Sequence, residues 1–286
     1  MTTPRKNIIR CTAAVLLSTT LGTLSAHAEL IAADSFDSYA DAADLNGQTG
    51  GTGWNGAWSV PTATANAAII SDQEITYNFG GTTLGGGNSL LINNGSNPLQ
   101  RDVFATPDTS GQDYYVSFIF NNTESTFVGW QAKDGDVDVG NDTIGLTNTN
   151  NTVAARVGGT NNTATGPISF VNGTTHFVVI GYTGWDGATY RTANIWLNPT
   201  SGVEPGESVS ASYTGAVGEG SSGFMGLYIR TVSFTTGTEF MYIDDLRVGT
   251  DWESVTAVAI PEPGSTALLA AGAAALFALA GRRRRA

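Results

Sequence analysis

Short runs of β-branched and aromatic residues, separated by turn residues, constrain this chain most. Residues 114–120 are the clearest run, because alternate side chains fall on opposite faces of an extended strand. One face carries Tyr114, Val116, Phe118 and Phe120, and the other carries Tyr115, Ser117 and Ile119. Helical periodicity is nearly absent between residues 29 and 260. We therefore expect an all-β fold, a single jelly-roll β-sandwich with roughly a dozen strands.

The other expected strands have the same composition and end at Gly, Asn or Pro. They cover 67–70, 75–79, 90–92, 127–131, 143–146, 152–157, 176–182, 191–197, 209–213, 224–229 and 240–248. Residues 176–182 are apolar on both faces, which predicts a strand in the middle of the sandwich. Its expected hairpin partner is 191–197, connected through a turn at Gly184–Gly187.

The first 28 residues have the three parts of a secretory signal peptide. These are a basic stretch with Arg5, Lys6 and Arg10, an apolar core over 13–24, and an A-x-A cleavage site formed by Ala26 and Ala28. Cys11, the only cysteine of the chain, lies ahead of the apolar core. The processed chain can therefore form neither an internal disulfide nor a thiolate metal site.

The last 26 residues form a second segment of three parts: Pro261-Glu262-Pro263, an uncharged run over 264–281, and Arg282-Arg283-Arg284-Arg285. As a helix the uncharged run would span roughly 27 Å, just enough for a hydrocarbon core of about 30 Å. The four arginines resist translocation and keep that end on the cytoplasmic side. The chain is thus expected to divide into a signal peptide (1–28), a body (29–260) and a hydrophobic C-terminal helix (261–286).

This three-part tail resembles the PEP-CTERM sorting signal of exported proteins of Gram-negative bacteria. The resemblance implies that the tail first anchors the protein in the inner membrane. An exosortase-type peptidase then cuts near Pro261-Glu262-Pro263, and the protein passes to the cell surface or the extracellular matrix. The alternative is an ordinary C-terminal transmembrane anchor.

The charge distribution argues against one class of partner. The chain has a net charge of −12, and seven of its 13 basic residues lie in the two end segments. The body is therefore strongly acidic and would be repelled by phosphate backbones, which excludes nucleic acid as an expected partner.

The body itself resembles exported PEP-CTERM proteins with a concanavalin A-like (LamG-like) jelly roll. The matching stretches are DSFD at 34–37, LNGQ at 45–48, GGTGWNGAW at 50–58, THF at 175–177, IWLNP at 195–199 and YIDDLRVGTDW at 242–252. The resemblance implies the fold, and binding of extracellular polysaccharide or matrix as a common use. It does not imply one ligand.

Two groups of carboxylates are candidates for a structural Ca²⁺. The first is the loop with Asp134, Asp136, Asp138 and Asp142, whose alternating acids and glycines suit a flexible oxygen cage. It does not fit an EF-hand, because Val139 stands where glycine is needed and Gly145 where a bidentate Glu is needed. A solvated acidic turn is the other interpretation.

The second group joins the two ends of the body. First and last strands of jelly rolls are often neighbours, so Asp34 or Asp37 could meet Asp244 or Asp245. Carboxylates held together without a cation would repel, so either a metal lies there or they point apart. Jelly rolls resembling this one often hold a structural calcium at this place. The alternative is that Asp244 or Asp245 bonds backbone or pairs with Arg247.

Aromatic residues in glycine-rich loops could stack on sugar rings. Trp185 and Tyr190 are the ligand-binding candidates. Trp185 would be exposed on the expected hairpin turn, and the alternative for it is packing. Trp54 and Trp58 are expected to pack, and Trp130 and Trp196 are expected in the core.

The motifs of the common catalytic classes are missing from the sequence. The E-x-D-x-x-E pattern of laminarinase-like jelly rolls does not occur, and His176, the only histidine after the signal peptide, lies in an apolar strand. We therefore expect no enzyme, but a non-catalytic surface or matrix protein that binds glycans. The alternatives are a glycan-active hydrolase or lyase whose acids meet only in space, and a purely structural module.

Overall fold

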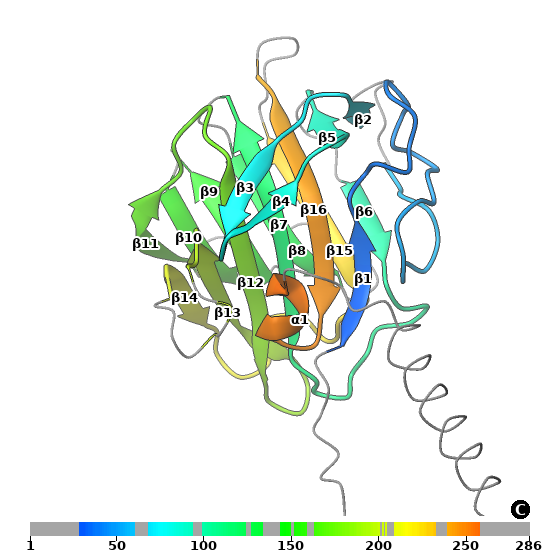
Figure 1. Cartoon of the computed structure of the whole chain (residues 1–286). Helices are drawn as coiled ribbons and strands as arrows, with labels where there is room; N and C mark the ends of the chain where they lie inside the picture. The colour runs from blue at the N-terminus through cyan, green and yellow to red at the C-terminus, as the bar shows by residue number, and fades with distance from the viewer. Residues whose placement is uncertain are drawn as a thin grey trace, which may run out of the picture.

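Two antiparallel β-sheets stack face to face and account for most of the described chain (Figure 1). The computed structural model describes residues 29–60, 68–93, 99–123, 127–133, 144–149, 152–158, 163–200, 202, 204, 209–232 and 239–257. In this part of the chain every strand pairing is antiparallel. The expectation of a mostly β fold built from a sandwich of antiparallel sheets is confirmed.

The larger sheet has eight strands in the order β14-β13-β12-β7-β16-β5-β2, with β1 also paired to β16. Its strands are β1 (Leu30–Asp34), β2 (Ala68–Ser71), β5 (Ser89–Ile92), β7 (Tyr114–Asn122), β12 (His176–Trp185), β13 (Tyr190–Leu197), β14 (Ala211–Thr214) and β16 (Met241–Gly249). The hairpin of β12 and β13 forms as expected. Its turn is Asp186–Thr189, however, because Trp185 is still paired with Tyr190.

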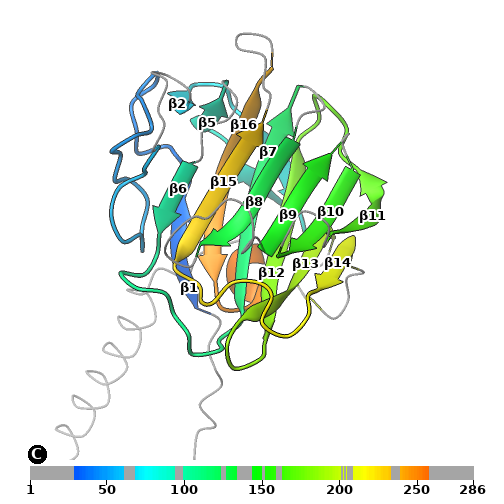
Figure 2. The same ribbon diagram turned by 180° about the vertical axis from the view of Figure 1, so that it is seen from behind.

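The smaller sheet has six strands in the order β11-β10-β9-β8-β15-β6, and Figure 2 shows it from its outer side. Its strands are β6 (Leu99–Asp102), β8 (Phe127–Lys133), β9 (Ile144–Thr149), β10 (Thr152–Val157), β11 (Thr163–Ser169) and β15 (Gly226–Val232). β6 and β11 were not expected from the sequence. β6 has the sequence LQRD, and β11 contains Gly166 and Pro167, residues that are uncommon inside strands.

The central strands of the larger sheet are buried on both faces, which explains the doubly apolar run at β12. Val178 and Ile180 point into the main core between the sheets, whereas Phe177 and Val179 belong to a second core on the outer face. β7 divides in the same way, with the faces that the alternation predicts.

A third layer covers the outer core. It consists of the hairpin of β3 (Thr76–Phe79) and β4 (Thr82–Gly85) and the short helix α1 (Trp252–Thr256), which lie over the larger sheet in Figure 1. Trp252 of α1 packs edge-on against Trp196 of β13, with ring centroids 4.9 Å apart. Burying aromatic side chains of this size is a large favourable term.

The two targeting segments, 1–28 and 261–286, lie outside the described residues, so the structure does not test their assignment. Across the residues that the structure does describe, no helix has the length and apolarity needed to cross a bilayer.

Candidate functional sites

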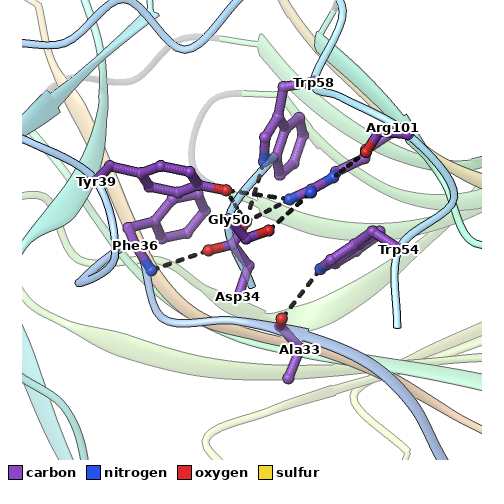
Figure 3. Close-up of polar contacts among 9 residues, drawn as sticks. Ala33, Asp34, Phe36, Tyr39, Gly50, Trp54, Trp58 and Arg101 are labelled. Carbon is purple, nitrogen blue, oxygen red and sulfur yellow. Dashed lines mark hydrogen bonds and ion pairs between the residues drawn. The ribbon is translucent and has the colours of Figure 1, made fainter. Parts of the chain in front are cut away.

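Asp34, one of the predicted calcium ligands, lies in a buried cluster behind the 35–60 loop (Figure 3). Its Oδ2 accepts hydrogen bonds from Nη1 of Arg101 at 2.6 Å, the hydroxyl of Tyr39 at 2.6 Å and Nε1 of Trp58 at 3.1 Å. Its Oδ1 accepts from the backbone N–H of Phe36 at 3.0 Å. The charge of Asp34 is therefore met by an arginine and three further donors, without any need for a cation.

Arg101 fixes the glycine-rich loop to β6. Its Nη2 donates to the carbonyl of Gly50 at 2.7 Å and its Nε to that of Gly56 at 3.3 Å. The guanidinium also lies 4.9 Å from the ring centroid of Trp54 and 5.4 Å from that of Trp58. Because the side chains of Arg101 and Asp34 are almost completely buried, this cluster is a structural support and not an open binding site.

Asp244 is the opposite case, since it is fully buried without a basic partner. Asp244 lies opposite Ile119 and so faces the β4 side of the larger sheet, and a β-bulge follows it between Asp244 and Arg247. Oδ1 accepts from the backbone N–H of Asp245 at 2.6 Å, and Oδ2 accepts from that of Gly86 at 3.0 Å. Burial raises the pKa of Asp244 to about 8, and the nearby charges of Asp245 and Asp37 add to this against the two N–H donors.

Asp37 and Asp244 approach each other across the Gly85–Asn88 loop. Oδ1 of Asp37 accepts from the backbone N–H of Asn88 at 2.9 Å. A Cβ on Gly87 would lie 2.1 Å from Oδ1 of Asp37, and one on Gly85 would lie 3.0 Å from Oδ2 of Asp244. Glycine is thus required at both positions for the loop to fit between the two carboxylates, and Gly85, Gly86 and Gly87 all have positive φ.

The predicted set of four calcium ligands is only partly assembled. Asp245 forms an ion pair with Arg247, with Nε 2.9 Å from Oδ1, which matches the alternative considered for it. Asp37 and Asp244 are the two predicted ligands that lie near each other, because the loop over Gly85–Asn88 contacts both carboxylates. Within the described ranges no group of three or more His, Cys, Asp or Glu side chains is placed to hold a metal. Asp134, Asp136 and Asp138 lie outside those ranges.

The aromatic candidates Trp185 and Tyr190 meet at the end of the β12–β13 hairpin. Their ring centroids are 4.8 Å apart, and Trp185 is partly exposed. The indole also packs on Gly111, where an added Cβ would be 2.7 Å from Cδ1. Tyr190 is only 1% exposed and donates its hydroxyl to the carbonyl of Gln112 at 2.7 Å. Tyr190 thus packs against the buried side of the Trp185 ring and has no exposed ring face of its own.

An open depression lies beside this aromatic pair. It is lined by Phe104, Ala105, Thr106, Pro107, Asp108 and Tyr114. The rings of Tyr114 and Tyr190 have centroids 6.1 Å apart, which connects the depression to the Trp185 platform. The Tyr114 hydroxyl donates to Asp108, and so does that of Ser110. Burial alone would raise the pKa of Asp108, but these hydrogen bonds outweigh it and hold the pKa below its ordinary value.

A second ionised carboxylate holds the hairpin turn in place. Asp186 accepts the backbone N–H groups of Ala188 and Thr189, each at 2.9 Å, and that of Gly218 at 3.3 Å. The bond from Thr189, followed by those from Ala188 and Gly218, lowers the pKa of Asp186. Arg191 lies beside this carboxylate, with Nε 3.5 Å from Oδ2, so Asp186 ties the hairpin turn both to the backbone and to a basic side chain.

The remaining aromatic and histidine predictions agree with the structure. Trp58, Trp130 and Trp196 are at most 2% exposed, Trp54 is partly buried against the main core, and His176 is buried. Sequence reasoning missed Arg101 as the partner of Asp34. The signal is visible only once β6 is known as a strand, because Arg101 comes two positions after Leu99 and so shares its buried face.

The C-terminal tail gives the clearest match to known proteins. Residues 259–285 match the PEP-CTERM protein-sorting motif. The chain therefore carries the sorting signal of an exported, surface-directed protein. A search among curated proteins finds no relative of the chain.

Several solved structures are similar in overall shape. Domain 4 of AbnA, a GH43 extracellular arabinanase from Geobacillus stearothermophilus, in complex with arabinotriose, is 16% identical, with a TM-score of 0.44 over 82% of this chain and 99% of that chain. The binding domain of botulinum neurotoxin serotype G is 12% identical, with a TM-score of 0.39 over 68% of this chain and 47% of that chain. Neither likeness identifies residues of this chain that bind a ligand.

Proposed function

We propose that this chain is a non-catalytic surface or matrix protein of a Gram-negative bacterium that binds extracellular polysaccharide. The signal peptide (1–28) exports it, the tail (261–286) anchors it in the inner membrane, and an exosortase-type peptidase cuts the tail near Pro261-Glu262-Pro263. The observation that carries the proposal is the sorting motif at 259–285, which directly follows a folded β-sandwich.

Glycan binding is placed at Trp185. Its ring rests on Tyr190 and Gly111 and has one partly exposed face, which suits stacking on the apolar face of a sugar. Asp186 is paired with Arg191, but the ionised Asp108 beyond Tyr114 has no such partner among the described residues and would repel uronic acids and sulfated sugars. The ligand expected there is a neutral polysaccharide.

A glycan array tests the binding part with the full chain in detergent. We expect binding to neutral glycans that is lost in Trp185→Ala and kept in Val217→Ala, a change of an exposed valine on the neighbouring loop. Binding that is unaffected by Trp185→Ala would place the site elsewhere. Binding to no glycan would favour the purely structural module.

The enzymatic alternative has its own readout. A hydrolase would release new reducing ends from a bound polysaccharide, and a lyase would produce an unsaturated sugar. We expect neither product. Either product, lost on substitution of a carboxylate, would replace binding with catalysis.

Processing of the tail is tested in the native host. We expect Glu262→Ala, or replacement of Arg282–Arg285 by serine, to leave a longer protein in the membrane fraction, as seen by immunoblotting. The wild-type protein should lose the tail. Equal lengths for all three proteins would favour an ordinary transmembrane anchor.

A further inference from the structure

Three Asn-Gly pairs lie in the part of the chain that the structure describes: Asn46-Gly47, Asn55-Gly56 and Asn172-Gly173. Asn-Gly is a dipeptide prone to deamidation, because glycine has no side chain to shield its backbone nitrogen. That nitrogen can attack the side-chain carbonyl carbon of the preceding Asn when two conditions hold. Its N–H must be free to lose a proton, and the Asn side chain must be free to turn toward it.

The fold restrains both reacting groups of Asn46-Gly47. Oδ1 of Asn46 accepts the backbone N–H of Val60 at 3.0 Å, which holds the side chain in place. The N–H of Gly47 donates to the carbonyl of Trp58 at 2.8 Å. Both hydrogen bonds must break before the nitrogen can attack, so we expect this pair to react slowly.

Asn172-Gly173 is restrained in another way. The N–H of Gly173 donates to the carbonyl of Asn122 at 2.7 Å. Oδ1 of Asn172 is buried and has no hydrogen-bond partner among the described residues. Attack on this side chain would place a negative charge on an oxygen that water does not reach, which is costly. We expect this pair to react slowly too.

Asn55-Gly56, in the glycine-rich stretch at 50–58, has neither restraint. Both residues are exposed, and neither the Asn55 side chain nor the Gly56 N–H forms a hydrogen bond with a described residue. Steric access does not separate the three pairs, because a Cβ on Gly47, Gly56 or Gly173 would meet nothing within 4 Å. The pairs therefore differ in the hydrogen bonding and burial of the groups that react.

We propose that Asn55 is a site of spontaneous deamidation in the folded protein. The nitrogen of Gly56 bonds to Cγ of Asn55, the Cγ–Nδ2 bond breaks, and ammonia leaves with the proton of the Gly56 N–H. The product is a succinimide ring, which water then opens. Opening at Cγ gives aspartate, and opening at the backbone carbonyl gives isoaspartate, whose backbone runs through Cβ and Cγ of residue 55.

The isoaspartate product weakens the attachment of this loop to β6. The backbone N–H of Asn55 donates to the carbonyl of Asp102 at 2.8 Å. The carbonyl of Gly56 accepts from Nε of Arg101 at 3.3 Å, beside the buried cluster of Figure 3. An extra backbone carbon between these two groups changes their spacing, so the two bonds cannot both keep their present geometry. The aspartate product leaves the backbone spacing unchanged.

Peptide mapping by mass spectrometry measures the reaction at each pair. The full chain is incubated in detergent at mildly alkaline pH, once folded and once in urea, where the hydrogen bonds of the fold are lost. We expect the rate in the folded protein, divided by the rate in urea, to be several-fold higher at Asn55 than at Asn46 and Asn172. A ratio at Asn55 no higher than at the other two would overturn the proposal.

The effect on the loop has a matched control. Aged protein with isoaspartate at residue 55 is separated by chromatography and compared with Asn55→Asp, which has the same charge on an unchanged backbone. We expect the isoaspartate form to unfold at a lower urea concentration. The same urea midpoint for both proteins would overturn the weakened attachment to β6.

Discussion

Asp34 and Asp244 are both buried aspartates on strands of the larger sheet, yet they are neutralised in different ways. Asp34 has Arg101 and a set of side-chain donors, whereas Asp244 has only two backbone N–H groups and a second carboxylate, Asp37, nearby. A buried charge is tolerated when it is paired, and otherwise the group keeps its proton. The comparison indicates that one region is stabilised by an ion pair and the other is sensitive to pH and cations.

Removing Arg101 should have the largest effect. Arg101→Met would leave the Asp34 carboxylate buried with no opposing charge, which typically costs about 3–5 kcal/mol of stability. Urea unfolding at neutral pH measures the change. The double variant Asp34→Asn/Arg101→Met removes both charges and should recover much of the loss. A small effect of Arg101→Met alone would show that the hydrogen bonds from Tyr39, Trp58 and Phe36 suffice for Asp34.

Asp244 should make stability depend on pH. The unfolded chain loses this proton near the ordinary aspartate pKa of about 4, while the folded protein keeps it up to about pH 8. Between these values the folded state binds more protons, so stability falls as the pH rises, by up to roughly 1.4 kcal/mol per pH unit. Asp244→Asn removes this contribution.

Urea unfolding of both proteins at several pH values measures the difference. The free energy of unfolding of the wild type minus that of Asp244→Asn should decrease steadily from pH 4 to pH 8. A constant difference over this range would mean that Asp244 titrates normally. Asp41→Asn, a change of an exposed acid, serves as the control and should show no such trend.

Bound calcium should give Asp244 an opposing charge, as Arg101 does for Asp34. A cation bound by Asp37 and Asp244 would stabilise the ionised form, adding about 2.7 kcal/mol at a hundredfold excess over its Kd. Tm after EDTA treatment, with and without added Ca²⁺, measures this. We expect a rise at pH 8 that is lost in Asp37→Asn. An equal response in wild type and Asp37→Asn would place any calcium elsewhere, for instance at Asp134, Asp136 and Asp138.

Removing the N-cap of α1 should have the smallest effect on stability. Asp251 caps α1 by accepting from the backbone N–H of Ser254 at 2.8 Å. Asp251→Ala should cost about 1 kcal/mol, the usual value of a lost N-cap, measured by urea unfolding. Asp251→Asn keeps an acceptor and should cost less. A loss as large as that of Arg101→Met would mean that α1 is needed for the whole sandwich to form.

The sequence predicted the layered β architecture because alternation of side chains reports burial directly. It worked best at β7 and β12, where each face meets a different core, and failed at β6 and β11, where Arg101, Gly166 and Pro167 break the apolar pattern. In such segments, pairing with neighbouring strands stabilises the extended conformation that the intrinsic propensity of the residues does not favour.

The candidate sites were less predictable, since they depend on contacts between distant residues. Asp34 and Arg101 are 67 positions apart, and Asp244 and Gly86 are 158 apart. Asp244 faces the outer layer opposite Ile119, and the bulge after it gives Asp245 a positive φ and lets it reach Arg247. Trp185 was expected on the turn itself, but the strand pairing extends to Tyr190 and turns its ring onto Gly111.

The position of β16 determines when the larger sheet can be completed. β16 is the last strand of the body, yet β1, β5 and β7 all pair with it. A chain that crosses a membrane with its N-terminus first would present these three strands without their common neighbour until residues 241–249 emerge. The outer core closes later still, when Trp252 and Val255 arrive. A chain exported in this order would therefore complete the larger sheet only when the residues just before the sorting motif have emerged.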